Sequence, residues 1–155
     1  MHQVVLLDRS DWILAYLYSP GRTGKVNEPV EGSVPLMKGL FLLQNELHEK
    51  VPYTFKPDMY GPLSLEVYDD INTLTAGKGE VVQESRVGQR WKTFRLNERG
   101  LAEAEEVYRH LPEPTRKSIL EVKTRISSFS MTELLDYVYE RYPDFARNSI
   151  LRIPR

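Results

Sequence analysis

The chain lacks cysteine, has few histidines and carries almost no net charge, and each of these absences narrows its function. Without cysteine it has no disulfide, no thiolate nucleophile and no cysteine zinc site. His2, His48 and His110 are far apart and show no metal-ligand spacing, so we expect no metal and no cofactor. Its 155 residues include 21 lysines and arginines against 22 aspartates and glutamates. This balance excludes a protein that coats nucleic acid nonspecifically, because such a protein has a strong positive field. A local basic patch remains compatible with the balance.

Long hydrophobic runs are absent as well. The longest apolar run, residues 13–18, is far shorter than the roughly 20 residues needed to span a bilayer. The first residues carry no basic region and soon reach Asp8 and Arg9, unlike a secretory signal. We therefore expect a cytoplasmic protein that has no contact with a membrane. A chain of this length buries roughly 70% of its unfolded surface and folds without disulfides.

Apolar residues recur at helical spacing in six segments, which predicts six helices. Their approximate bounds are 10–18, 35–50, 61–74, 97–111, 114–126 and 130–142. Gly61-Pro62 is expected to open the third helix, because proline suits a first helical turn. Residues 19–33 hold five glycines and prolines and are predicted to form a long loop. Segments 80–84 and 90–96 are predicted to be the strands of a β-hairpin around Gly88.

Three helices followed by a hairpin is the element order of a winged helix. The predicted fold is therefore mainly α with a small β-hairpin (α+β), a winged helix-turn-helix with a C-terminal helical extension. Residues 1–110 are assigned to the winged-helix domain, with the wing at about 80–96, and residues 111–155 to an extension that packs on it or dimerises. The predicted core comprises Leu36, Leu40, Leu43, Val67, Ile71, Leu74, Phe94, Leu96 and Leu101.

The last three helices carry more apolar residues than a small winged core should absorb, which predicts a homodimer through them. The alternative is that these helices fold back and cover the core. The residues concerned are Val107, Tyr108, Leu111, Ile119, Leu120, Leu134, Leu135, Val138 and Tyr139.

Catalytic patterns are incomplete throughout the chain. Residues 21–25 (GRTGK) superficially resemble a phosphate loop, but Ser19 stands where its first glycine belongs and Val26 where a magnesium-binding hydroxyl belongs. Asp69 and Asp70 are adjacent on a predicted helix and so point about 100° apart, which prevents them from sharing a substrate or metal. No strand–turn–helix nucleophile elbow is present. We therefore expect that the protein is not an enzyme.

Three short segments carry a resemblance to a known family. They are residues 36–41 (LMKGLF), 60–62 (YGP) and 66–68 (EVY), within roughly residues 34–76. Together they resemble the Panacea-domain proteins and related uncharacterised prokaryotic proteins. Residues 96–100 (LNERG) resemble the strand-to-helix junction of many winged-helix transcription regulators. Panacea proteins are antitoxins that neutralise toxins by direct protein contact, so the resemblance implies a toxin-like partner protein and no catalytic residue.

Charge separates two candidate interfaces. Residues 78–99 hold six cations against three carboxylates, whereas residues 56–77 hold one lysine against four carboxylates. Glu66, Asp69 and Asp70 lie off the apolar stripe of the third helix and are expected to face outward. Such an acidic helix opposes major-groove reading, because phosphates dominate affinity for DNA. The first hypothesis is a transcription regulator that binds double-stranded DNA through the wing, at Arg86, Arg90, Lys92 and Arg95.

Trp91, among these cations, is expected either to pack under the sheet or to stack on a base or sugar. The second hypothesis is an antitoxin-like module whose third helix binds a partner protein. Its candidate residues are Tyr60, Leu65, Glu66, Tyr68 and Asp69.

Overall fold

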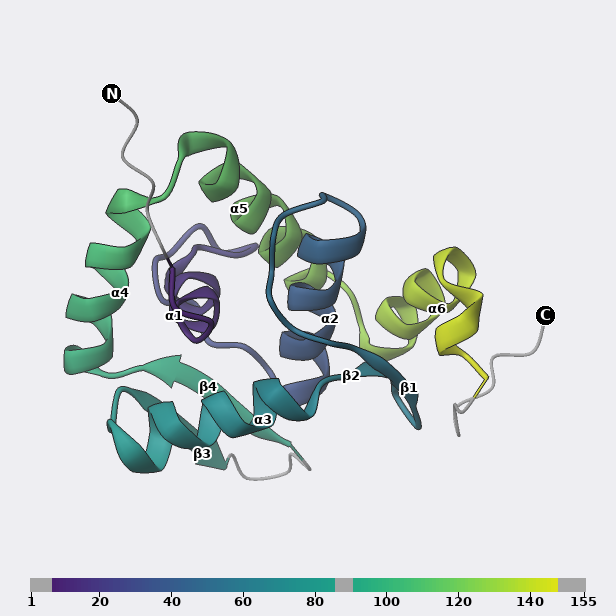
Figure 1. The fold of residues 1–155 in the computed structure, drawn as a ribbon, viewed down its shortest axis with the longest axis horizontal. Coiled ribbons are helices and arrows are strands. Elements are labelled where there is room, and N and C mark those ends of the chain that lie inside the picture. Colours follow the sequence, from purple (N-terminus) through teal and green to yellow (C-terminus); the bar gives the residue numbers. More distant parts are fainter. Residues whose placement is uncertain (1–6, 86–90, 148–155) are drawn as a thin grey trace.

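The structure is a computed structural model that describes residues 7–85 and 91–147. Within these ranges it is mainly helical, with six α-helices and two small antiparallel hairpins (Figure 1). The helices are α1 (Asp11–Tyr18), α2 (Ser33–Asn45), α3 (Leu65–Asn72), α4 (Glu98–His110), α5 (Glu113–Ser127) and α6 (Met131–Arg141). The strands are β1 (Lys56–Asp58), β2 (Gly61–Leu63), β3 (Val81–Ser85) and β4 (Lys92–Leu96). A π-helical turn, Thr73–Gly77, extends α3, and a 3-10 turn, Pro143–Phe145, follows α6.

Helix α1 lies at the centre of the fold. Figure 1 shows it end-on, with α4, α5 and α2 arranged around it. Every residue from Trp12 to Leu17 is buried, so the helix has no solvent face along this stretch. The sequence correctly predicted this helix, whose apolar composition suits a position surrounded by other elements.

The first hairpin, β1–β2, corrects the predicted start of the third helix. Gly61 and Pro62 form strand β2, which pairs with β1 from Lys56↔Leu63 to Asp58↔Gly61. Gly61 has a φ of 87°, which favours glycine, and Pro62 is tolerated because this ribbon has only two strands. Helix α3 begins instead at Leu65, where the Ser64 hydroxyl accepts a hydrogen bond from the Val67 N–H.

The second hairpin confirms the strands predicted within 80–96. Strand β3 pairs with β4 in the register Val81↔Leu96 through Ser85↔Lys92, and Val30 adds a bridge to Phe94 on the other edge. Between α2 and α3, however, residues 46–64 intervene and contain the whole first hairpin. This connection is longer than the turn of roughly three or four residues in a helix-turn-helix.

The hydrophobic core contains residues from all six helices and from the second hairpin. Of the nine predicted core residues, eight are buried and Leu101 is half-buried against them. Helix α5 packs against α2 and α1, and α6 packs against α2 and β2.

The apolar surplus of the last three helices therefore belongs to this core. Val107 and Tyr108 are half-buried against it, Leu120 is 41% exposed, and the other residues of that set are buried. The fold-back alternative thus accounts for the surplus. The homodimer stays a prediction, but the apolar residues of the last three helices no longer support it, because they are used within the chain. In the described ranges, no helix is both long and apolar enough to cross a membrane.

Candidate functional site

A group of exposed apolar side chains lies on the β1–β2 turn and α3. Met59 is 49% exposed, Tyr60 41%, Leu65 65% and Tyr68 38%. Tyr60 and Tyr68 both line one small cavity of about 30 Å³, and Leu65 and Tyr68 lie three residues apart on one helix face. We call these four residues the hairpin–α3 patch. Three of them are partner-binding candidates from the sequence, and the structure brings them together.

Lys38 lies beneath this patch and was not predicted as a functional residue. Its side chain is 2% exposed, and its ammonium donates a hydrogen bond to the Pro62 carbonyl over 3.3 Å. Burial lowers the pKa of Lys38 to about 7, and the nearby Asp58 carboxylate only partly opposes this effect. The contact joins two of the segments that carry the family resemblance, 36–41 and 60–62. The signal available in the sequence was a lysine within an otherwise apolar helical segment.

An ion-pair network holds α3 to the residues before α1. The Arg9 guanidinium donates to both carboxylate oxygens of Asp70 over 2.8 Å and to Glu66 over 3.2 Å. The Tyr53 hydroxyl also donates to Asp70 over 2.7 Å, and the Thr54 N–H donates to Glu66. Burial alone would raise the pKa of Asp70, but the bonds from Arg9 and Tyr53 outweigh it and lower that pKa.

This network corrects the expectation that all three α3 carboxylates face outward. Asp69 is exposed as predicted, but Glu66 and Asp70 are bound within the chain. As a partner-binding candidate, Glu66 therefore has an intramolecular role as well.

The wing residues have unequal surroundings. Lys92 is exposed at the start of β4, whereas the Arg95 guanidinium pairs with the Glu84 carboxylate across the hairpin. Arg86 and Arg90 lie outside the described residues. Trp91 is 43% exposed, so it does not pack under the sheet as the first alternative expected.

The loop that superficially resembles a phosphate loop already holds an anion from its own chain. The Thr23 N–H donates to the Glu28 carboxylate over 2.8 Å, and the Thr23 hydroxyl and the Gly21 backbone also bond to it. Burial alone would raise the pKa of Glu28, but these bonds and the charge of Lys123 outweigh it and lower that pKa. The donors of this loop thus bind a carboxylate of the same chain.

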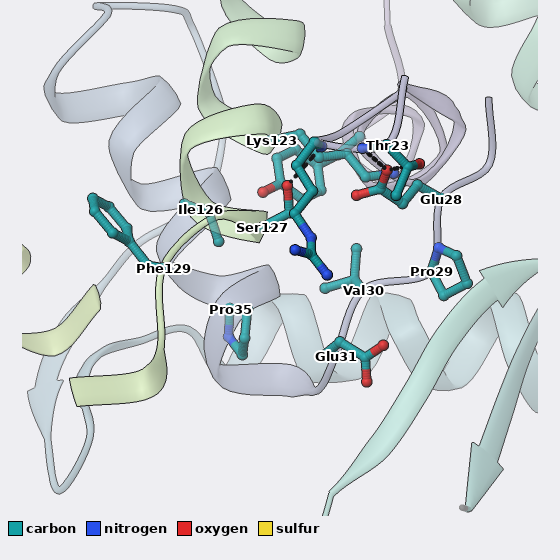
Figure 2. Close-up of a pocket in the computed structure, with 12 residues that line it drawn as sticks. Thr23, Glu28, Pro29, Val30, Glu31, Pro35, Lys123, Ile126, Ser127 and Phe129 are labelled. Carbon is teal, nitrogen blue, oxygen red and sulfur yellow. Dashed lines mark hydrogen bonds between the residues drawn. The ribbon is translucent and has the colours of Figure 1, made fainter. Parts of the chain in front are cut away.

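Lys123 is a second buried cation that sequence reasoning missed. It comes from α5, is 2% exposed, and donates to the carbonyls of Leu17 over 2.8 Å and Ser19 over 2.6 Å. These carbonyls lie at the C-terminal end of α1, where a cation is favourable. Burial lowers the pKa of Lys123 to about 7, partly opposed by Glu28. Lys123 and Glu28 both line a cavity of about 290 Å³ between the loop and α5 (Figure 2).

In the part of the chain that the structure describes, no group of three or more histidine, cysteine, aspartate or glutamate side chains is arranged to hold a metal ion. In comparisons with known proteins, no family model matches the chain, and neither any curated protein nor any solved structure matches it.

Proposed function

We propose that this chain is a non-enzymatic, antitoxin-like interaction module that binds a partner protein through the hairpin–α3 patch. The observation that supports this most is the exposure of four large apolar side chains, from 38% to 65%, at neighbouring positions. Contiguous exposed apolar groups are typical of interaction surfaces, and tyrosines are enriched among the residues that contribute most to binding.

The charges around the patch select the kind of partner. Asp69 is exposed beside Tyr68, and Asp58 lines the small cavity together with both tyrosines. The partner is therefore a protein whose contact surface is apolar at its centre and basic at its rim, since complementary charges favour association. By analogy with the Panacea proteins, that partner is a toxin-like protein neutralised by direct contact.

The support under the patch suits this function. Lys38 ties α2 to the β1–β2 hairpin, and Ser64 caps α3 immediately beside Leu65. These contacts hold the patch residues in place before a partner arrives. Preorganisation of this kind reduces the entropic cost of binding.

Binding of double-stranded DNA by the second hairpin is the other candidate function. Trp91 and Lys92 are both exposed and adjacent, as stacking on a nucleic acid and contact with a phosphate would require. The element order α1, α2, α3 and then β3–β4 also keeps the winged-helix assignment as part of this proposal. We place it second because Arg95 is paired with Glu84 and α3 is acidic.

Photo-crosslinking in the native cell tests the first function. A photoreactive amino acid replaces Leu65 in one protein and Leu120 in a control, because Leu120 is also exposed but lies on α5. We expect a protein crosslinked only from position 65. That protein, once purified, should bind the wild-type chain at least about 100-fold more tightly than the Leu65→Asp variant, a difference of about 2.7 kcal/mol. Leu120→Asp should bind like wild type.

Equal crosslinking from both positions, or equal affinity of Leu65→Asp and wild type, would contradict the function. DNA binding is tested by fluorescence anisotropy with a duplex at low salt. Lys92→Ala and the double variant Arg86→Ala/Arg90→Ala should weaken binding similarly across sequences and lower the salt slope by about one ion for each charge removed. A duplex that does not bind at low salt rejects this candidate.

A further inference from the structure

We propose that the cavity of about 290 Å³ between the 19–32 loop and α5 binds a small organic carboxylate with an apolar body. The site shares no residue with the hairpin–α3 patch and lies on other elements. It is therefore a regulatory or cargo site in addition to the proposed function, and its test does not depend on the identity of any partner.

Apolar and polar side chains both line the cavity. Figure 2 shows Val30, Pro35, Ile126 and Phe129 along the cavity, with Thr23, Glu28 and Lys123 gathered at one end. Apolar walls with a few convergent polar groups are the usual composition of a small-molecule site. The volume is near the lower limit of about 300 Å³ for such sites, so the ligand is about the size of benzoate.

The carboxylates that line the cavity are already bound within the chain. Glu28 accepts hydrogen bonds from Thr23 and Gly21, and Glu31 accepts one from the Thr93 hydroxyl over 3.3 Å. Both carboxylates therefore already have hydrogen-bond partners within the chain.

Arg22 lies at the rim of the cavity and, unlike these carboxylates, has a side chain that no described residue binds. The backbone N–H of Arg22 donates to the Ser127 hydroxyl over 2.9 Å, which attaches this part of the loop to α5. Its guanidinium, however, forms no hydrogen bond or ion pair with any residue of the described ranges. A guanidinium offers paired donors that match a carboxylate. Among the charged side chains that line the cavity, the Arg22 guanidinium thus remains available to a ligand, and the ligand that it would pair with is an anion.

Tyr16 supplies an independent observation. Its side chain is 1% exposed and lines the cavity, yet its hydroxyl has no hydrogen-bond partner in residues 7–85 and 91–147. The ring is held in place, because it lies against Gly39 of α2 and its centroid is 5.9 Å from the Lys123 ammonium. Leaving a buried hydroxyl unbonded is unfavourable, and a polar atom of a ligand would satisfy it.

Titration of the full-length protein with benzoate, followed by amide chemical shifts in NMR, tests the site. We expect saturable shifts at Val30, Ile126 and Phe129, and at least about tenfold weaker binding of benzamide, the neutral analogue. Arg22→Gln should weaken benzoate binding about tenfold or more, and Tyr16→Phe about threefold or more. Lys25→Gln is the matched control, since Lys25 is an exposed cation of the same loop that does not line the cavity. It should leave the affinity within about twofold.

Three results would overturn the proposal. The first is the absence of saturable shifts with benzoate, phenylacetate and cyclohexanecarboxylate at about 10 mM, a concentration that detects millimolar affinity. The second is equal binding of benzoate and benzamide. The third is the same loss of affinity in Arg22→Gln and Lys25→Gln, which would show that benzoate responds only to overall charge.

Discussion

Replacing the buried Lys38 by methionine should stabilise the protein, although it removes a hydrogen bond. Methionine has nearly the same length and carries no charge. The pKa of Lys38 falls from 10.5 to about 7 through burial, and each pKa unit corresponds to about 1.4 kcal/mol, so the cost of the buried ammonium is at most about 5 kcal/mol. The lost bond to the Pro62 carbonyl, which is long at 3.3 Å, offsets about 1 to 2 kcal/mol of this. We expect Lys38→Met to raise the free energy of unfolding at pH 7 by about 2 to 4 kcal/mol.

The pH dependence of this gain tests its cause. Between pH 7 and 10.5 the native state binds fewer protons at Lys38 than the unfolded state does, so the wild type becomes more stable as the pH rises. The advantage of Lys38→Met should therefore be largest at about pH 7 and should shrink towards pH 10.5. Lys123, whose pKa is also lowered, raises the stability of both proteins in this window and cancels in the difference.

Denaturant unfolding at about pH 7 and pH 10 measures the difference, with the fluorescence of the buried Trp12 as the signal. Lys92→Met is the control, because Lys92 is exposed, and it should change the stability by less than about 0.5 kcal/mol. A Lys38→Met protein that is less stable than the wild type at pH 7 would refute the reasoning. A stability difference that is the same at both pH values would refute it too, because the effect would then not come from the charge.

Three further substitutions test other parts of the fold. Gly39→Ala would place a Cβ on the Tyr16 ring and should cost about 1 to 3 kcal/mol in thermal unfolding, with part of this cost recovered in a Tyr16→Leu background. Glu80 is buried, has a carboxylate oxygen with no hydrogen-bond partner among the described residues, and has its pKa raised from 4.5 to about 7 by burial and by its contact with the Glu103 carboxyl. The carboxyl of Glu80 therefore stays protonated in the native state between pH 4.5 and about pH 7, where it is ionised in the unfolded state, so the wild type loses stability as the pH rises through this range. Glu80→Gln should be more stable than wild type by about 1 to 3 kcal/mol at pH 8 and no more stable at pH 4. Equal gains at both pH values would contradict this. Asp70 has its pKa lowered, so its contribution is present above pH 3.8 and lost as the pH falls below it. Asp70→Asn should cost about 1 to 3 kcal/mol at pH 7, and a loss that persists unchanged at pH 2 would refute the role of the charge.

The candidate surfaces were only partly visible in the sequence. Tyr60, Leu65 and Tyr68 were predicted as a group because they lie near one another in the chain, and the structure leaves all three exposed. The partners of charged residues were not predictable in the same way. Arg9 pairs with Glu66 and Asp70 across nearly the whole first half of the chain, and no local pattern signals such a contact.

The cavity between the loop and α5 was invisible for the same reason. Its lining comes from α1, the 19–32 loop, the start of α2 and the end of α5. The phosphate-loop comparison could show which parts were missing from residues 21–25. It could not show that Glu28, a few residues later, supplies the anion.

The sequence by itself determined the helices whose signals are local. The capping box of Ser130 and Glu133 and the Asn97 cap each depend on residues three positions apart, and both caps form in the structure. Where a local sequence signal is compatible with two structures, the tertiary structure decided which of them forms. Gly61-Pro62 suits a helix start as well as the edge of a two-stranded ribbon, and the ribbon forms where β2 packs against α2 and α6. Likewise, the apolar stripes on α5 and α6 indicate only that these faces must be buried. Packing against α1, α2 and β2 buries them within one chain. The sequence does not specify this partner, because the hydrophobic effect is non-directional and depends on the apolar area removed from water.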